Sequence, residues 1–348
     1  MLKIAQYVTV GRYKTGGVLG AGSKQVVISN KTLWENAVRL LSIWKTPRTK
    51  KQFIDYVQQN TTISMSDINH LIELFEQNSF LIESSDYNSE DRFSRNKLYY
   101  NYFQGNPNTI QSNLEQSSIT IIGCGGIGNH VSAILATSGI NNITLVDPDV
   151  IELSNLTRQI LFKESDIGKL KVEVLKDELL KRNSLLNIKC IVTEITSPND
   201  ISKLDDSDLY IISADSPSSL MDWANEACVQ KQQAYINIGY INDISLVGPF
   251  YIPNKTACFN CKRYVPDDIQ NEILSSEMQI INNDFKATSF APVNNISSAM
   301  ASADIIRYLG GFGDVLSKNK RIGIHTGSLK IETQEYSINE NCLICQKH

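Results

Sequence analysis

The last two thirds of the chain alternate short apolar runs with longer segments of helical periodicity. Strands are predicted at 119–122, 143–147, 188–192, 209–213, 234–238 and 244–251, and a long helix at 169–181. Strands that alternate with helices usually pair in parallel, so this pattern predicts an α/β fold with a doubly wound, mostly parallel sheet. Side chains that follow the strands should gather at one edge, where such sheets bind ligands.

The first 85 residues or so have a different pattern, typical of a small α+β unit. Extended segments are predicted at 4–10 and 25–28, around a glycine-rich loop at 16–22, with a returning strand at 80–82. One helix is expected after Asn30, a favourable N-cap, a second at 51–57 and a third from Ser66. Three helices with flanking strands predict a winged-helix-like domain.

The predicted third helix bears on the partner of this unit. Between Asp67 and Gln77 the sequence contains three acidic residues and no Lys or Arg. A helix that reads DNA needs cations, so peptide binding or scaffolding is the better prediction for this unit.

Length and composition bear on the number of domains, the type of partner and the compartment. A chain of 348 residues is long for a single core, so we predict a winged-helix-like domain at 1–88, a polar linker at 89–113 and an α/β domain at 114–348. The formal net charge of −4 argues against nucleic acid as the partner. No signal peptide and no apolar run of membrane-spanning length is evident, so the cytoplasm is the expected compartment, with no membrane partner.

A glycine-rich loop follows the first predicted strand of the α/β domain and opens a helix. Its glycines are Gly123, Gly125, Gly126 and Gly128. Glycines in such a loop let phosphates approach the backbone, and the helix N-terminus offers free N–H groups to them. Asp147 ends the next strand, 19 residues beyond Gly128, where a carboxylate accepts hydrogen bonds from a ribose. A Rossmann-like nucleotide site is therefore predicted.

Polar and cationic residues after this loop make the prediction more specific. Asn155, Arg158, Gln159 and Lys171 present two amides and two cations, and cations aimed at phosphate neutralise charge in phosphoryl or nucleotidyl transfer. Asp149 completes the predicted nucleotide-binding set. A dehydrogenase would explain the glycines and Asp147 but has no need of the later cations.

Asp215 follows the apolar strand at 209–213 and is the predicted Mg²⁺ ligand. A carboxylate at a strand exit beside phosphates can hold Mg²⁺ while the ion keeps waters and phosphate oxygens. Its alternative role is the N-cap of a helix that starts near Ser219.

Two C-x-x-C pairs, Cys258 with Cys261 and Cys342 with Cys345, indicate a structural Zn²⁺ site. Four thiolates suit a closed tetrahedral zinc site, which would attach the C-terminal tail to the α/β domain. A redox pair is the alternative, but two pairs in a reducing compartment favour zinc. The other three cysteines are predicted to pack in the core or the phosphate loop.

Taken together, these residues resemble the E1-like adenylating superfamily of the ThiF and MoeB type. The resemblance covers roughly 90–348, and is carried by the motif at 92–96, the glycine loop, the polar cluster at 155–159 and the zinc cysteines. A closer similarity, over the full length, is to the peptide adenylyltransferases of microcin C biosynthesis. It is carried by the stretches 11–17, 33–36, 123–131, 236–240 and 290–295.

The resemblance implies a homodimer whose N-terminal domain clamps a short ribosomal peptide. The C-terminal carboxylate of that peptide, typically that of an Asn, would attack the α-phosphate of ATP or CTP and release pyrophosphate. A P–N bond between peptide and nucleotide would follow.

The resemblance also implies residue roles. Arg95 would reach the triphosphate of the partner protomer, Asn155, Arg158 and Lys171 would grip the phosphates, and Asp215 would hold Mg²⁺. Asp147 would contact the ribose.

Three other functions remain open from the sequence. The first is adenylation of a sulfur-carrier or ubiquitin-like protein, and the second is an NAD-dependent oxidoreductase or redox sensor. The third is a peptide-binding module with a vestigial nucleotide pocket, against which the intact Arg95 and Asp215 argue.

Overall fold

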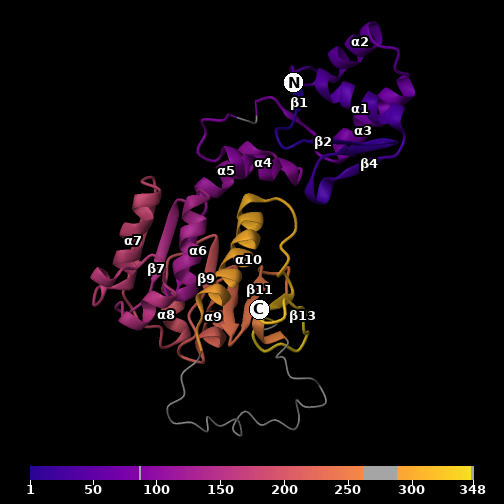
Figure 1. The fold of residues 1–348 in the computed structure, drawn as a ribbon. Helices are drawn as coiled ribbons and strands as arrows, with labels where there is room; N and C mark the ends of the chain where they lie inside the picture. Colours follow the sequence, from indigo (N-terminus) through magenta and orange to yellow (C-terminus); the bar gives the residue numbers. More distant parts are fainter. Residues whose placement is uncertain (86–87, 262–287, 346–348) are drawn as a thin grey trace. The chain divides into compact units, whose positions relative to one another are not determined.

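The computed structural model describes residues 1–85, 88–261 and 288–345, and the chain divides into two compact units, Met1–Ser112 and Asn113–His348 (Figure 1). The N-terminal unit contains two small antiparallel sheets. One pairs β1 (Leu2–Ile4) with β5 (Leu81–Glu83), and the other has the order β2 (Val10–Tyr13), β3 (Gly16–Leu19), β4 (Val26–Ile28).

Three capped helices build the core of this unit. They are α1 (Lys31–Ile43), α2 (Lys50–Asn60) and α3 (Met65–Gln77), and a short 3₁₀ turn, η1, spans Gly22–Lys24. As predicted, Asn30 caps α1, because its Oδ1 accepts a hydrogen bond of 2.9 Å from the backbone N–H of Leu33. The rings of Trp44 and Phe53 stack in the core with their centroids 3.5 Å apart.

Two of the predictions for this unit are wrong. The extended segment expected at 4–10 is interrupted after β1 by a turn, in which Val8 N–H donates to the Ala5 carbonyl at 3.1 Å. The glycine-rich stretch expected as a loop contains strand β3. Gly17 of this strand has a packing role, since a Cβ on it would overlap the indole of Trp34 on α1.

The segment predicted as a linker, 89–113, is partly helical. It holds α4 (Ser94–Tyr102) and most of α5 (Pro107–Gln116), and the division between the two units falls inside α5. Asp91 stabilises the start of α4, because its carboxylate accepts a hydrogen bond of 2.8 Å from Phe93 N–H and pairs with Lys97.

The second unit is built on an eight-stranded sheet with the order β13-β12-β11-β10-β9-β6-β7-β8. Strands β6 to β10 are parallel and β11 to β13 add antiparallel partners, which confirms the predicted mostly parallel α/β sheet. The strands are β6 (Ser118–Ile122), β7 (Asn142–Val146), β8 (Asn187–Ile191), β9 (Leu209–Ile212), β10 (Tyr235–Ile241), β11 (Ile244–Tyr251), β12 (Lys320–His325) and β13 (Ile331–Glu335).

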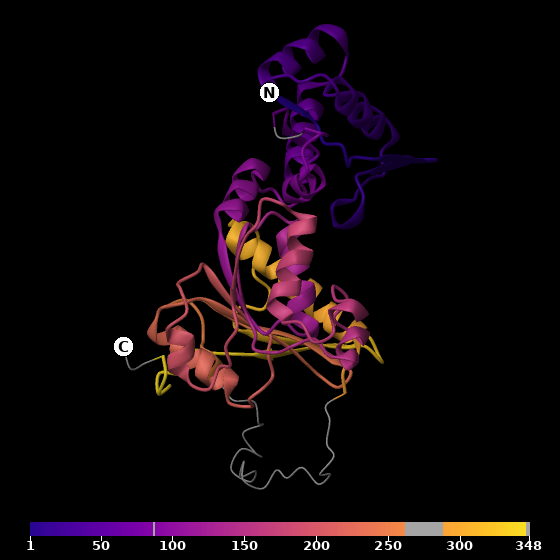
Figure 2. The same ribbon diagram turned by 90° about the vertical axis from the view of Figure 1, so that its left-hand side faces the viewer.

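Helices cover both faces of this sheet, as Figure 2 shows. Helices α6 (Gly126–Thr137) and α10 (Ala291–Gly310) pack side by side over one face, with α7 (Lys171–Arg182) next to α6. Helix α9 (Leu220–Gln230) packs against side chains of the other face, next to α8 (Pro198–Ser202). Short 3₁₀ turns are η2 (Leu153–Thr157), η3 (Glu164–Asp166) and η4 (Phe259–Cys261).

The strand order reverses between β6 and β9, and the predicted site residues follow these strands. Chain connections leave β6 and β9 toward opposite faces of a doubly wound sheet, so a crevice opens between their carboxyl ends. Gly123 follows β6 and Asp215 follows β9, which places both at this crevice. Among the described residues, no helix is long and apolar enough to cross a membrane.

Candidate functional site

The glycine loop passes tightly between β6 and the end of β9. Gly123 has φ +96°, and a Cβ there would lie 2.7 Å from the backbone nitrogen of Ala214. Gly128 lies inside α6, where a Cβ would overlap the carbonyl oxygen of Gly123. These two glycines are needed by the protein's own packing.

Gly125 differs from these two. Its φ is −72°, and a Cβ on it would meet only Gln159 Nε2, at 3.9 Å. The protein therefore leaves space at Gly125 that its own packing does not require. A loop of this kind lets a ligand approach the backbone at the start of a helix.

Asp147 fixes the loop to the end of β7. Its Oδ2 accepts a hydrogen bond of 2.6 Å from Cys124 N–H in the glycine loop, and its Oδ1 accepts one of 2.9 Å from Asp149 N–H. Only 6% of Asp147 is exposed, and this burial raises its pKa, an effect that the ammonium of Lys171 partly offsets. The lone pairs that remain on the two oxygens can accept hydroxyl hydrogen bonds, as a ribose contact needs.

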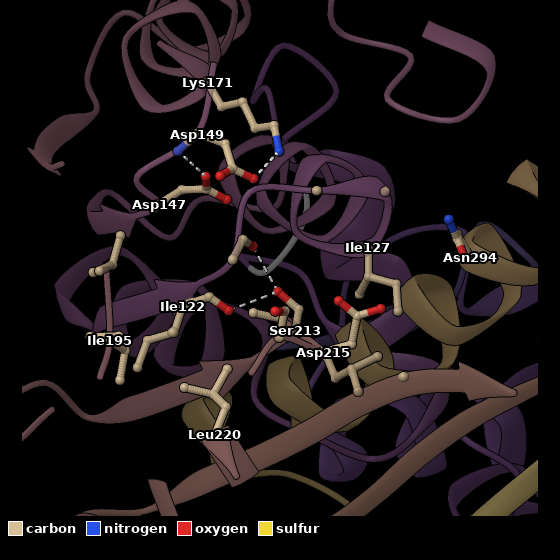
Figure 3. A pocket seen from close by; sticks show the side chains of 18 of the residues that line it. Ile122, Ile127, Asp147, Asp149, Lys171, Ile195, Ser213, Asp215, Leu220 and Asn294 are labelled. Carbon is tan, nitrogen blue, oxygen red and sulfur yellow. Dashed lines mark hydrogen bonds and ion pairs between the residues drawn. The ribbon is translucent and has the colours of Figure 1, made fainter. Parts of the chain in front are cut away.

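Lys171 is the first residue of α7 and its side chain is buried. Its Nζ pairs with Asp149 Oδ2 at 2.6 Å, and its backbone N–H donates to the Asp149 carbonyl at 3.0 Å. The two side chains differ in exposure, with 8% for Lys171 and 61% for Asp149. The ammonium is therefore held by the fold, whereas its counterion is largely exposed to solvent. Figure 3 shows the two side chains paired.

The polar cluster predicted at 155–159 begins inside the turn η2 and continues past its end. Asn155 is buried, and its Oδ1 accepts a hydrogen bond of 3.3 Å from Glu152 N–H. Arg158 donates from Nη1 to the Ser154 carbonyl at 3.0 Å. Gln159 is 2% exposed, and its Oε1 has no hydrogen-bond partner within the described part of the chain.

Asp215 is exposed and lies just beyond β9. Ser213 joins this strand end to the glycine loop by donating from its hydroxyl to the Gly123 carbonyl at 2.8 Å. The alternative role of Asp215 as a helix cap is wrong, because α9 begins at Leu220 with Ser219 in the N-cap position. Figure 3 shows the Asp215 carboxylate on the other side of the glycine loop from Lys171 and Asp149.

These side chains line one cavity of about 640 Å³. It takes in ten of the residues predicted for the nucleotide site: Gly123, Gly125, Gly126, Asp147, Asp149, Asn155, Arg158, Gln159, Lys171 and Asp215. Gly128 lies outside the cavity lining, in the packing of α6, and Arg95 lies on α4 of the N-terminal unit.

The sequence interpretation did not place two further polar residues of this cavity. Asn294 comes from α10 and Arg321 from β12, and each has a buried side-chain atom without a hydrogen-bond partner among the described residues. Both lie more than a hundred residues beyond the glycine loop and follow no local motif. Only the stretch at 290–295, noted for its similarity to a family, pointed to Asn294.

The four predicted zinc cysteines come together in space. Their sulfur atoms all lie within 4.8 Å of one another, with Sγ–Sγ distances of 3.6 Å for Cys258–Cys342, 3.7 Å for Cys258–Cys261 and 3.4 Å for Cys261–Cys345. A tetrahedral ion with Zn–S bonds of about 2.3 Å separates its sulfurs by about 3.8 Å. The cluster therefore fits the size of a zinc site.

The pKa shifts differ between the thiols of this cluster, and burial raises the pKa of Cys345. The Cys258 thiol beside it lowers the pKa of Cys261 to about 5, while the same hydrogen bond raises the pKa of Cys258. The fully buried Asn225 donates to Cys258 Sγ at 3.6 Å and accepts a hydrogen bond of 2.6 Å from Tyr235. The remaining cysteines, Cys124, Cys190 and Cys228, lie outside the cluster.

A comparison with models of protein families shows to which family the chain belongs. The model of the ThiF family matches residues 97–344, which is well over half of the sequence. The chain belongs to the ThiF family. The family assignment confirms the resemblance drawn from the glycine loop, the polar cluster and the cysteines.

Solved structures extend the similarity to the whole chain. The crystal structure of E. coli MccB with AMPCPP and MccA has a TM-score of 0.90 and 40% identity, and the match covers 99% of both chains. The structure of the microcin C7 biosynthetic enzyme MccB in complex with N-formylated MccA gives 41% identity, a TM-score of 0.90 and the same coverage.

Curated relatives match over shorter lengths. The adenylyltransferase and sulfurtransferase MOCS3 of Culex quinquefasciatus is 30% identical over 153 residues, which are 43% of this chain and 34% of that protein. The chain spans about a third to a half of the length of the curated relatives it matches.

Proposed function

We propose that the protein is a nucleotidyltransferase that activates the C-terminal carboxylate of a short ribosomal peptide with ATP or CTP. The observation that carries the proposal is the single cavity where the glycine loop, Asp147, Lys171, Arg158 and Asp215 meet. The similarity to MccB along both entire chains supports a peptide as the acyl substrate.

The reaction needs no nucleophilic side chain, because the substrate carboxylate is itself the nucleophile. One of its oxygens attacks the α-phosphorus, a C(O)O–P bond forms, and the bond to the bridging oxygen breaks so that pyrophosphate leaves with the electron pair. The protein then contributes position and charge. Lys171 and Arg158 neutralise the negative charge that grows on the leaving pyrophosphate, and Asp147 holds the ribose.

We assign Mg²⁺ to Asp215. Its exposed carboxylate at the cavity wall offers the hard oxygen ligand that Mg²⁺ takes, with coordination positions left for phosphate oxygens and water. The ion would supply further charge neutralisation on the phosphates.

We further propose that the acyl nucleotide goes on to a peptidyl–nucleotide with a P–N bond, as in the biosynthesis of microcin C-type antibiotics. The side-chain amide nitrogen of the terminal Asn would attack the activated carbonyl, so that a succinimide forms and the nucleoside monophosphate leaves. The succinimide nitrogen would then lose its proton, attack the α-phosphorus of a second nucleotide and displace its pyrophosphate, which forms the P–N bond. The N-terminal unit is the proposed peptide clamp. Its third helix, α3, carries acidic side chains and no Lys or Arg, which supports a peptide over nucleic acid.

A second function is favoured by the curated relatives. Adenylation of the C-terminal carboxylate of a sulfur-carrier or ubiquitin-like protein uses the same cavity and the same chemistry, and MOCS3 is named as an adenylyltransferase and sulfurtransferase. An oxidoreductase would use Asp147 and the glycines but would leave Lys171, Arg158 and Asp215 unexplained.

Pyrophosphate exchange tests the proposal. The protein, Mg²⁺ and labelled pyrophosphate are incubated with ATP or CTP and a short peptide that ends in Asn, with the same peptide amidated at its C-terminus as the control. We expect label to enter one nucleotide with the free acid and not with the amide, and mass spectrometry to find a peptidyl–nucleotide. Exchange that requires a folded carrier protein ending in Gly-Gly would establish the second function instead. Binding of NADH without any exchange would overturn both.

The homodimer and Arg95 are part of the same proposal, with Arg95 acting on the triphosphate of the partner protomer. Mixing an Arg95→Ala protein with an Asp215→Asn protein should then restore exchange, to about a quarter of the wild-type level, because one of the two sites in a mixed dimer keeps both residues. The quarter follows from random pairing of equal amounts. No recovery after verified exchange of protomers would contradict this role.

We propose zinc for the four-cysteine cluster, with a structural role. Cys342→Ser should lower the zinc content below one ion per chain and the melting temperature by about 5–10 °C, because the C-terminal segment loses its attachment to β11 and α9. Metal analysis and thermal unfolding measure both. Cys190→Ser is the control, since Cys190 lies outside the cluster and should leave zinc bound. A wild-type protein purified without chelators that contains no zinc would contradict the assignment.

A further inference from the structure

The side chain of Asn294 is buried in the wall of the nucleotide cavity without a protein partner for its amide oxygen. The residue lies in the first turn of α10 and is 1% exposed. Its Oδ1 has no hydrogen-bond partner among the described residues. Figure 3 shows this oxygen toward α10, so the atom of the amide that a ligand in the cavity would meet is Nδ2.

The amide nitrogen of Asn294 points at the start of α6. A Cβ placed on Gly126 would overlap Asn294 Nδ2, and would lie 3.4 Å from Arg158 Cδ. The amide of Asn294 and the side chain of Arg158 therefore flank the same glycine. Figure 3 shows the nitrogen of Asn294 on the side that faces the loop and its oxygen toward α10.

Three hydrogen bonds hold this turn of α10 in place. Ser298 Oγ donates to the Ile127 carbonyl of α6 at 3.3 Å, and Ser297 Oγ donates to the Gly239 carbonyl of β10 at 2.8 Å. Ser245 Oγ on β11 donates to the Val293 carbonyl at 2.7 Å. The backbone that carries Asn294 is thus held by α6, β10 and β11, and a supported backbone preorganises a ligand contact.

We infer that Asn294 donates a hydrogen bond from Nδ2 to a phosphoryl oxygen of the bound nucleotide, next to Arg158. The inference rests on the proposed function and adds a nucleotide contact to it. Phosphoryl oxygens are charged acceptors, so they satisfy an amide N–H better than a neutral group does. The opposite orientation of the amide would aim its oxygen at the phosphates and would be repulsive.

Ligand binding to variants of the full-length protein tests the inference. Asn294→Ala should weaken the affinity for ATP with Mg²⁺ by about tenfold to hundredfold, the range for a hydrogen bond to a charged group. Asn294→Asp keeps the shape but replaces the donor by a carboxylate, so its loss should be larger. Affinity for adenosine, which has no phosphate, should stay at the wild-type value in both variants. Titration calorimetry or ligand-observed NMR measures each.

The neighbouring Asn295 provides a matched control. It is exposed and lies outside the cavity lining, so Asn295→Ala and Asn295→Asp should bind ATP like the wild type. An ATP affinity of Asn294→Ala within twofold of the wild type would overturn the inference. Equal losses for ATP and adenosine would also overturn it, because a packing defect acts on both ligands.

The ATP-binding experiment and the pyrophosphate-exchange experiment can fail independently of each other. ATP binding requires no acyl substrate, whereas pyrophosphate exchange does. A wild-type protein that lacks exchange but whose ATP affinity depends on Asn294 would remove the proposed function alone. Normal exchange with an unchanged Asn294→Ala affinity would remove this inference alone.

Discussion

Asp215→Asn should lower the turnover of pyrophosphate exchange by about 10²–10⁴-fold, the loss expected when several kcal/mol of metal-based charge neutralisation disappears. The amide keeps the shape of the side chain but is a weak ligand for Mg²⁺. Because Asp215 is exposed and follows the end of β9, the substitution removes no core contact. The melting temperature should therefore stay at the wild-type value.

Asp314→Asn provides the matched control for this prediction. Asp314 is an exposed carboxylate of the same unit that lies outside the cavity lining, so its amide variant should turn over at the wild-type rate. Raising the Mg²⁺ concentration should recover part of the Asp215→Asn activity and none of the activity of an unfolded variant. Wild-type turnover in Asp215→Asn at limiting Mg²⁺ would remove Asp215 from the metal site.

Lys171→Met should reduce the specificity constant for the nucleotide by about 10²–10³-fold, as expected for removal of one preorganised donor to a developing charge. The ammonium of Lys171 is buried at the start of α7 and pairs with the carboxylate of Asp149. Methionine fills the same volume and keeps the helix.

Two further measurements separate charge from packing in this variant. Lys169→Met is the control, because Lys169 is 57% exposed, pairs with Asp166 and lies outside the cavity lining. Its specificity constant should match the wild type. Lys171 also holds down the pKa of Asp147, which burial raises. Without Lys171 the pKa of Asp147 rises further, so Asp147 becomes protonated at a higher pH. As the pH is lowered, Lys171→Met should therefore lose nucleotide binding at a higher pH than the wild type does. A specificity constant within threefold of the wild type would contradict the assigned role.

The N-terminal unit shows where local patterns misled the prediction. The glycines at 16–22 indicate a loop by composition, yet Gly16 and Gly17 lie in strand β3, which pairs with β2 and β4. Gly17 leaves room there for the indole of Trp34 on α1. The extended segment expected at 4–10 is broken by a turn in which Tyr7 donates a hydrogen bond of 2.5 Å to the Ser79 carbonyl. Both features depend on contacts between residues that are distant in the sequence.

The sequence alone determined the α/β architecture and most of the cavity. Helical and strand periodicities are local, and the carboxyl ends of neighbouring parallel strands necessarily meet, so Gly123, Asp147 and Asp215 could be grouped before their coordinates were known. The spacing of the two C-x-x-C pairs likewise predicted the cluster that the structure assembles. These inferences rest on properties that a few consecutive residues carry.

Only the tertiary structure decided which buried side chains lack partners among the described residues and which glycines the packing of the protein requires. Asn294 and Arg321 reach the cavity from α10 and β12, far along the chain from the glycine loop, and no spacing rule connects them to it. Gly125 and Gly128 are chemically identical residues, yet one borders open space and the other touches a backbone carbonyl. Such differences arise from close packing between distant segments, which fixes atomic neighbours that the order of residues does not reveal.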